Sequence, residues 1–393
     1  MPSSAPLRPK APNAHKPEVP ISYDINLPYV DVNKQSSSPY PQYLPSWEPV
    51  WFDPLPPFKY EDPALRVKDR SKPNLLGPGS KVQHIQPSLG SVVKGVQLNK
   101  LSDTAKDELA LLIAERKVVA FPDQDLIDAG PDEQEQFMRH FGKPNYQPIS
   151  GSMPGHPAFH IIHRDGNRDE IARFLSQRTT TTLWHQDVSY EIQPPGYVML
   201  GLLQGPEVGG DTVFAATDLA YKRLSPTLTS FLDSLKVVHS SANMINHARL
   251  TGGLVRKDPV DTVHPLVRVH PVTGEKCLFI NGEFITRIEG LKEPETRWLR
   301  DFLMQHIVGG MTSRPACAGS RALLSCLTTV PHFVCIPSSL SLSFPSLPAL
   351  MLTHYVDSAI VDYIDEEYGA KARHIFRLIA LGEKPIPVYD EFE

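Results

Sequence analysis

The sequence has few cysteines, no long apolar run and little net charge, and each shortage excludes a class of protein. Four cysteines in 393 residues do not make a disulfide framework. No apolar run is long enough to cross a bilayer, and the N-terminus lacks the apolar core of a secretory signal. A net charge of −5 and a pI of about 6.3 indicate neither a nucleic-acid partner nor an anionic membrane partner. We therefore expect a cytoplasmic protein.

The N-terminal part is rich in proline. Of the 39 prolines, 14 lie within the first 60 residues, among serines, lysines and scattered aromatic residues. Such a stretch cannot bury enough apolar surface to offset the entropy lost on ordering it. We therefore predict an extended arm over residues 1–75 and a single large domain over residues 76–390. The stretch from Tyr40 to Tyr60 is expected to lie along this domain or along a partner subunit, and a homo-oligomer is left open.

Apolar periodicity and turn signals predict a mixed α and β protein. Within the helix expected at 293–306, the spacing places Trp298, Phe302 and Leu303 on one side. A strand is expected around the Trp-His-Gln-Asp stretch described next. The other expected elements are helices at 103–116, 131–141 and 217–235 with a break near Pro226, strands at 117–121 and 197–203, and a hairpin over 263–280.

The most informative stretch is Leu183 to Asp187, which reads LWHQD. It places an imidazole and a carboxylate two residues apart, in His185 and Asp187. On an extended strand, residues i and i+2 face the same side, so both side chains can hold one cation. A histidine and a carboxylate are two thirds of the facial triad of non-haem Fe(II) oxygenases. His-x-Asp alone is common, so its surroundings decide its meaning.

The surroundings carry further motifs in a fixed order. LWHQDVSYE is followed by QPPG, by an apolar run over 197–203, and by GGDTVF over 209–214. This order of W-H-x-D, P-P and G-G-D-T resembles the taurine/2-oxoglutarate dioxygenase (TauD/TfdA) family, including the fungal sulfonate dioxygenases. The resemblance covers residues 80–310 and 357–386.

The resemblance implies a fold, an activity and a set of cofactors. The fold would have a mainly β core, a double-stranded β-helix or jelly roll with flanking helices. His185 and Asp187 would ligate Fe(II), which works with 2-oxoglutarate and O2 to hydroxylate a small anionic substrate, releasing succinate and CO2. For an alkyl sulfonate, hydroxylation of the carbon next to sulfur would expel sulfite.

Four further residues receive roles from the resemblance. Thr212 and Arg373 match the positions that bind the far carboxylate of 2-oxoglutarate, and a guanidinium fork suits a carboxylate. Arg377 matches the arginine that faces the substrate anion in sulfonate-using members. Phe284, in the stretch NGEFITRI, matches an aromatic residue that lines the substrate.

Two substrate-site positions depart from the taurine-specific members. Gln147 falls where those members carry a histidine, and Thr181 falls where they carry an asparagine. These departures argue against taurine itself as the substrate. An alkyl sulfonate is expected, with a phenoxyacid, an alkyl sulfate or a carboxylate as alternatives of the same class.

Residues 311–356 differ in amino-acid composition from the rest of the chain. They contain no Asp or Glu and are dominated by Ser, Leu, Pro and Cys. The family would carry W-E-P-G, D-N-R and its second ligand histidine here, and the sequence has none of these. Codons that could encode residues 310–332 can also be read in a shifted frame. One permitted reading is HDFQACVRWEPGTVVVSDNRAPL, which contains both missing motifs. We therefore predict a frameshift followed by a retained intron, and we treat 311–356 as an anomalous insert.

The identity of the third metal ligand depends on this segment. Joining the chain across the inferred intron permits histidine at position 357, where the sequence has Asp357. His354 lies three residues earlier, and on a strand the two would be about 10 Å apart on opposite faces. Asp357, His354 or no third ligand are therefore all open. The alternative function is an inactive jelly-roll pseudoenzyme or small-anion binder.

Overall fold

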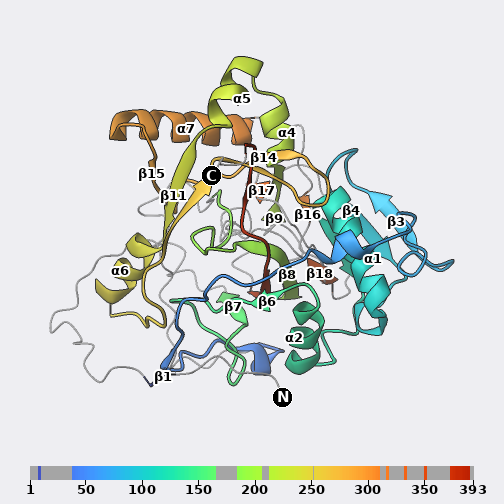
Figure 1. The fold of residues 1–393 in the computed structure, drawn as a ribbon. Helices are drawn as coiled ribbons and strands as arrows, with labels where there is room; N and C mark the ends of the chain where they lie inside the picture. Colours follow the sequence, from blue (N-terminus) through green and yellow to red (C-terminus); the bar gives the residue numbers. More distant parts are fainter. Residues whose placement is uncertain are drawn as a thin grey trace, which may run out of the picture.

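The computed structural model describes residues 38–164, 184–205, 212–250, 252–309 and 372–389, together with the backbone of four short strands outside these ranges. Two long strands, β8 (Pro195–Gln204) and β19 (Arg373–Leu381), lie side by side in antiparallel pairing at the middle of the molecule (Figure 1). Every residue of β19 is buried, so this pair forms the centre of the fold.

The main sheet contains eight strands in the order β3-β4-β5-β18-β8-β19-β6, with β7 also paired to β19. All neighbours are antiparallel except β4 and β5. The strand β18, which falls within the anomalous segment, lies between β5 and β8. The remaining bounds are β3 (Lys81–His84), β4 (Ser91–Lys94), β5 (Val119–Pro122), β18 (Ala349–Met351), β6 (Lys143–Pro144) and β7 (His160–Arg164).

Smaller antiparallel sheets complete the mixed α and β fold that the sequence predicted. Two of them have three strands, in the orders β12-β11-β15 and β14-β13-β20, and three are pairs. The bounds are β11 (Lys236–Ser240), β12 (Asp261–Pro265), β13 (Val267–Val269), β14 (Lys276–Leu278), β15 (Ile285–Ile288) and β20 (Ile386–Pro387), and the pairs are β1 (Arg8–Pro9) with β2 (Val50–Trp51), β9 (Thr212–Val213) with β16 (Ala316–Cys317), and β10 (Ala215–Ala216) with β17 (His332–Phe333).

The predicted helices are present, with small differences at their ends. α1 (Asp103–Arg116) begins after Ser102, whose hydroxyl accepts a hydrogen bond from the amide of Ala105 and so caps the helix. Lys117 ends α1 at a φ of 66°, so β5 begins two residues later than predicted. The other helices are α2 (Pro131–Arg139), α4 (Thr217–Lys222), α5 (Pro226–Leu232), α6 (Ala242–Leu250) and α7 (Glu293–Gly309), with short 3-10 helices η1 (Pro41–Tyr43), η2 (Pro63–Arg66) and η3 (Leu98–Lys100).

Of the hairpin predicted over 263–280, the part from residue 267 to residue 278 is present. β13 and β14 pair antiparallel, with Val267 opposite Leu278. The first predicted strand is divided at Leu266, because β12 joins β11 in a different sheet. The helix expected at 217–235 is likewise divided before Pro226, as predicted.

The predicted apolar side of α7 was right for Leu303 and wrong for Trp298 and Phe302. Leu299, Leu303 and Ile307 are buried, whereas Trp298 is 66% exposed and Phe302 is 36% exposed. The two aromatic rings stack on each other, with centroids 6.0 Å apart. Trp298 and Phe302 therefore cover one another on the outer surface and do not join Leu303 in the core.

The described part of the proline-rich arm packs against the domain. Tyr43 and Phe52 are each only 1% exposed. The ring of Tyr43 stacks on Phe376 of β19, and its backbone carbonyl lies 2.9 Å from Nε2 of His374. The arm around Tyr43 thus packs on the strand that carries the two predicted tail arginines.

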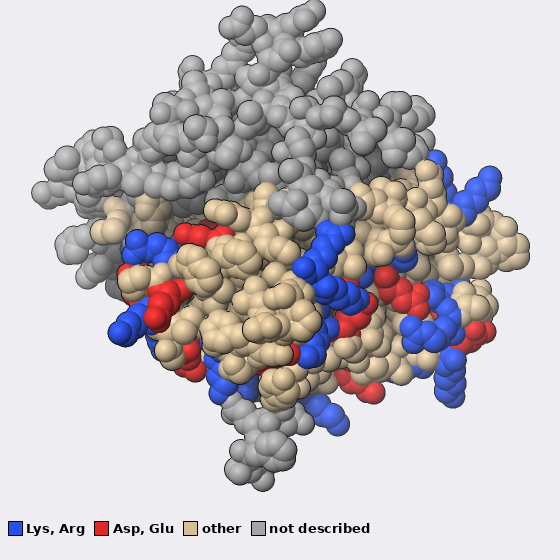
Figure 2. Space-filling model, turned by 90° about the horizontal axis from the view of Figure 1, so that it is seen from above, with Lys and Arg blue, Asp and Glu red and all other residues tan. Residues whose placement is uncertain are grey.

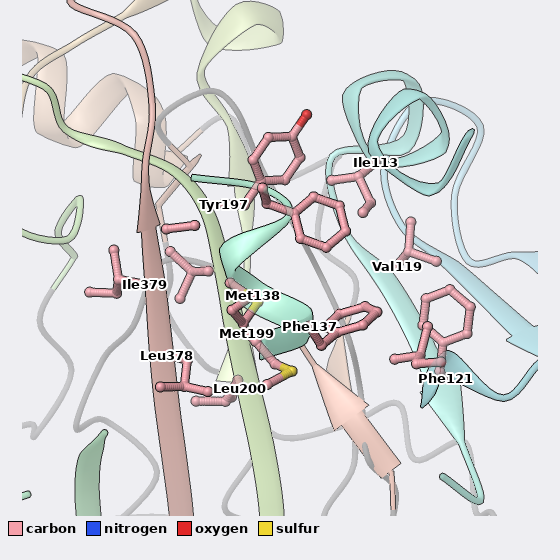
Figure 3. Close-up of a cluster of buried hydrophobic side chains, with 14 of the residues drawn as sticks. Ile113, Val119, Phe121, Phe137, Met138, Tyr197, Met199, Leu200, Leu378 and Ile379 are labelled. Carbon is pink, nitrogen blue, oxygen red and sulfur yellow. The ribbon is translucent and has the colours of Figure 1, made fainter. Parts of the chain in front are cut away.

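The core consists of two apolar clusters. The larger one joins α1, α2, β5, β8 and β19, and Figure 3 shows its side chains converging between the central strands and α2. The smaller one lies under α4, α5 and α7. Trp184, directly before His185, packs against both clusters.

Charged residues of both signs are interspersed over the described part of the face shown in Figure 2. Among the described residues, none of the helices combines the length and the apolar character that a membrane span requires. The described surface in this view therefore presents no extended field of one sign.

A buried carboxylate, Asp62, makes the fold sensitive to pH. Its Oδ1 accepts hydrogen bonds from the hydroxyl of Tyr197 and the amide of Ala64, at 2.7 and 2.9 Å. Burial raises the pKa of Asp62 from 3.8 to about 7, and the bond from Tyr197 opposes this only in part. The folded state therefore holds a proton that the unfolded chain releases, and the resulting stabilisation is lost as the pH rises from about 4 through 7.

Asp62→Asn should remove this pH dependence. The amide stays neutral and its oxygen can accept the same two hydrogen bonds, so the variant should be more stable than the wild type at pH 8, on the order of 3 kcal/mol. Urea unfolding at pH 5 and pH 8 measures the difference. Asp233→Asn is the control, because Asp233 also accepts a tyrosine hydroxyl but is paired with Lys276. An unchanged pH slope in Asp62→Asn would contradict the assignment.

Candidate active site

The two predicted ligands lie at the start of a tight turn and not on the strand that the sequence predicted, with His185 two residues before the turn and Asp187 as its first residue. Residues 184–186 are irregular and residues 187–190 form a turn. The amide of Glu191 donates to the carbonyl of Val188 and closes this turn. Val188 has a φ of 34°, an uncommon conformation for a β-branched residue. Such strain persists only where the surroundings impose it, and it is typical of functional sites.

His185 and Asp187 are both buried where the chain enters this turn. His185 is 8% exposed and Asp187 is 5% exposed. Nη1 of Arg377, which comes from β19, lies 2.7 Å from Oδ2 of Asp187. The turn thus meets the central strand through a buried ion pair, and one of the two predicted tail arginines lies directly at the carboxylate that is predicted to bind the metal.

His160 of β7 completes this arrangement. β7 pairs with β19 so that His160 stands opposite Arg377, and Nη2 of Arg377 contacts Nδ1 of His160. Burial, followed by the positive charge of Arg377, lowers the pKa of His160 well below its ordinary value. The charges of Arg256 and His185 act in the same direction. The imidazole of His160 is therefore neutral beside the guanidinium.

Of the two residues predicted to bind 2-oxoglutarate, the structure describes Arg373 fully and only the backbone of Thr212. Arg373 is buried on β19, four residues before Arg377. It pairs in register with Arg164 of β7, and residues four apart on a strand face the same side. Thr212 begins the short strand β9, and only its backbone is described. Thr181, His354 and Asp357 lie outside the described residues.

The predicted substrate residues approach the turn from two directions. The ring of Phe284 packs edge-on against Tyr190, with centroids 5.0 Å apart. Burial and the charges of Glu191 and Asp187 raise the pKa of Tyr190 well above its ordinary value. From the other side, Gln147 is buried and its amide lies 3.5 Å from Oδ1 of Asn145.

A buried ion pair supports the turn beside Gln147. Nζ of Lys257 lies 2.5 Å from Oε1 of Glu191, and Nδ2 of Asn145 donates to the same oxygen at 3.0 Å. Lys257 and Glu191 are 1% and 3% exposed. The backbone carbonyl of Glu191 also lies 3.0 Å from Nε2 of His264. These contacts fix the end of the turn four residues after Asp187.

A second network fixes the middle of the turn. The hydroxyl of Ser189 lies 2.8 Å from both Nδ1 of His239 and Nδ2 of Asn281. Oδ1 of Asn281 accepts hydrogen bonds from the amides of Glu283 and Phe284. Asn281 therefore links the position of Phe284 to the position of the ligand turn.

The kinds of donor at this turn, an imidazole and a carboxylate, are those that bind Fe(II) in proteins. Imidazole and carboxylate are two of the three ligands in a facial Fe(II) site. Among the described residues, no third His, Cys, Asp or Glu joins them. The described chain therefore supplies two ligands, and the two predicted candidates for the third lie outside it.

Sequence reasoning missed His160, Tyr190 and the pair of Lys257 with Glu191. The histidine within the apolar stretch Phe159–Ile162 was a signal for a buried polar contact. Its partner is determined only by the register of β7 on β19, which one sequence does not specify.

Comparison of the sequence with known proteins identifies the same dioxygenase family. The profile described as "Taurine catabolism dioxygenase TauD, TfdA family" matches residues 81–309. The alpha-ketoglutarate-dependent sulfonate dioxygenase of Saccharomyces cerevisiae is 44% identical over 68% of this chain, and the match spans 66% of the yeast protein, slightly less than two thirds of its length. An alpha-ketoglutarate-dependent dioxygenase of Penicillium expansum is 36% identical over 69% of this chain and 77% of its own length.

A solved structure agrees with these sequence matches. The crystal structure of a taurine dioxygenase from Burkholderia xenovorans aligns with a TM-score of 0.55 and 25% identity, over 79% of this chain and 92% of the other. The sequence profile spans more than half of the 393 residues and includes the ligand turn. The family suggested by the Trp-His-Gln-Asp stretch is therefore confirmed, and the chain belongs to the TauD/TfdA dioxygenase family.

Proposed function

We propose that this chain is an Fe(II)- and 2-oxoglutarate-dependent dioxygenase that hydroxylates a small organic anion, with an alkyl sulfonate as the substrate class. One observation carries the proposal: His185 and Asp187 are both buried where the chain enters a single turn, and the guanidinium of Arg377 lies 2.7 Å from the carboxylate. The name of the yeast relative supports the sulfonate. The structural likeness to a taurine dioxygenase supports the family's double-stranded β-helix as the fold.

Each residue has a defined task in this proposal. His185 and Asp187 hold the iron, which supplies the activation of O2 when it is bound. Arg373 and Thr212 orient 2-oxoglutarate through its far carboxylate. Arg377 binds the acidic group of the substrate, and burial of the site excludes water so that this charge pairing is strong.

The substrate pocket is inferred to differ from that of taurine-specific enzymes. Phe284, packed on Tyr190, offers an apolar wall for an alkyl chain. Gln147 and Thr181 stand where taurine-specific members carry His and Asn, so the groups facing an amine end differ in their hydrogen bonding. We therefore infer a preference for an unsubstituted alkyl sulfonate over taurine.

Succinate release tests the proposed function. The full chain with Fe(II), ascorbate and 2-oxoglutarate should release succinate faster with pentanesulfonate than with taurine, and sulfite should appear in equal amount. The chain carrying Asp357→His, which supplies the second imidazole and the third ligand of the triad, should bind metal more tightly and turn over faster. Phenoxyacetate and an alkyl sulfate are the comparison substrates. Stimulation by one of these and by no sulfonate would overturn the substrate class.

We infer that residues 311–356 arise from a frameshift and a retained intron. The family match ends at residue 309, directly before this segment, which supports the inference. Residues 357–386, including β19, resemble the family again. The genomic sequence over codons 305–360 decides the matter. If no frame there encodes W-E-P-G followed by D-N-R, the inference is wrong.

A further inference from the structure

Arg377 touches two groups at once, in a buried contact with Asp187 and a partly buried contact with His160. Nη1 lies 2.7 Å from Oδ2 of Asp187, and Nη2 contacts Nδ1 of His160. Arg377 is 2% exposed and Asp187 is 5% exposed. The guanidinium therefore lies between a predicted metal ligand in the turn and a histidine of β7.

The contact with His160 has a fixed direction. A guanidinium has only donors, so Nδ1 of His160 must accept, and the proton of the neutral ring is on Nε2. The pairing of β7 with β19 holds His160 directly opposite Arg377. His160 thus sets the position of one end of the guanidinium without adding a charge.

The contact with Asp187 places two cations in competition for one carboxylate. A divalent metal bound by Asp187 would lie close to the guanidinium, and like charges in a buried site repel strongly. An anion bound to Arg377 offsets this repulsion. Metal and anion should therefore bind more tightly together than either does alone, with the guanidinium as the link.

We propose that Arg377 is shared between the metal ligand Asp187 and the substrate anion, so that metal loading and anion binding strengthen each other, with His160 as the positioning residue that holds the guanidinium between the two. This inference rests on the proposed function, since it requires a metal at Asp187. Coupling between two sites is reciprocal and typically 5- to 150-fold. Close contact within a buried site places the expected value at about tenfold or more.

Calorimetry with Co(II) on the full chain tests the coupling without any turnover. Saturating ethanesulfonate should lower the Kd of Co(II) for the wild type about tenfold. Arg377→Gln should bind Co(II) more tightly than the wild type in the absence of ethanesulfonate, because the competing cation is gone. The same variant should respond less than about twofold to ethanesulfonate.

Arg268→Gln is the matched control. It removes the same charge from another buried strand residue, Arg268 of β13, whose ion-pair partner is Glu383 and which has no assigned role in binding. Its Co(II) affinity should stay within about twofold of the wild type, and its response to ethanesulfonate should persist. Equal tightening in both variants would mean that the effect is one of overall charge, and would overturn the proposal.

His160 is tested by two substitutions of different chemistry. His160→Asn places an amide oxygen near the position of Nδ1 and should retain the response to ethanesulfonate. His160→Leu removes the acceptor and should reduce the response to below about threefold. Equal responses in the two variants would overturn the role of His160.

The outcomes separate this inference from the proposed function. A wild-type chain that binds no Co(II) under any condition would overturn both. A chain that binds Co(II), with a Kd that ethanesulfonate does not change, would overturn the coupling and leave the metal site in place. Inorganic sulfate is the second probe, and an equal response to it would assign the coupling to any oxyanion, with no contribution from the alkyl chain.

Discussion

His185→Ala is expected to abolish the tight binding of Co(II) or Fe(II) and to lower 2-oxoglutarate turnover by about a thousandfold or more, which corresponds to roughly 4 kcal/mol. The buried imidazole is one of the two predicted metal donors that lie within the described residues. Its loss leaves a single carboxylate that is already paired with Arg377. Calorimetry with Co(II) and succinate release measure the two effects.

The choice of His185 over Asp187 makes this test clean. Asp187→Ala would remove the ion-pair partner of Arg377 as well as a ligand, so the variant should also lose stability. His306→Ala is the control, because it removes an imidazole from α7 that lies 2.8 Å from the carbonyl of Ala220. Full metal affinity in His185→Ala would contradict the ligand assignment, as would its loss in His306→Ala.

Lys257→Met is expected to cost about 3–5 kcal/mol of folding free energy, because it leaves the carboxylate of Glu191 buried without its cation. The pair is almost fully buried, with 2.5 Å between Nζ and Oε1. The double variant Lys257→Met with Glu191→Leu removes both charges and should recover most of the loss. Urea unfolding measures all three proteins.

Lys276→Met is the comparison for this prediction. Lys276 pairs with Asp233 at 2.7 Å, but its side chain is 37% exposed. Such pairs contribute about 0.2–1 kcal/mol, so the loss should be small. If Lys257→Met costs no more than Lys276→Met, the support that we assign to the ligand turn is wrong.

The sequence allowed prediction of those features that depend on local signals. α1 has the predicted bounds because Ser102 caps its start, and α5 begins at Pro226 because proline is favoured in the first helical turn. The turn at the metal site escaped prediction for a physical reason. Its shape depends on contacts with Lys257, Asn145 and Asn281, which lie far away in the sequence.

Packing partners were harder to predict than the elements themselves. On α7, hydrophobicity alone favoured Trp298 and Phe302 as core residues, but two large rings that stack on each other tolerate exposure. Arg373 and Arg377 could be placed together because they are four residues apart. That Arg377 contacts His160 follows from strand register, which requires the three-dimensional structure.

The position of Trp184 between two apolar clusters has a consequence for directed evolution. Because this side chain packs on both clusters, substitutions under α7 and substitutions beside β8 both reach the residue that precedes His185. Libraries that select for heat resistance through either cluster would then alter iron retention as a by-product. Screening such libraries by metal content as well as by melting temperature would show how far a change in packing around Trp184 shifts His185.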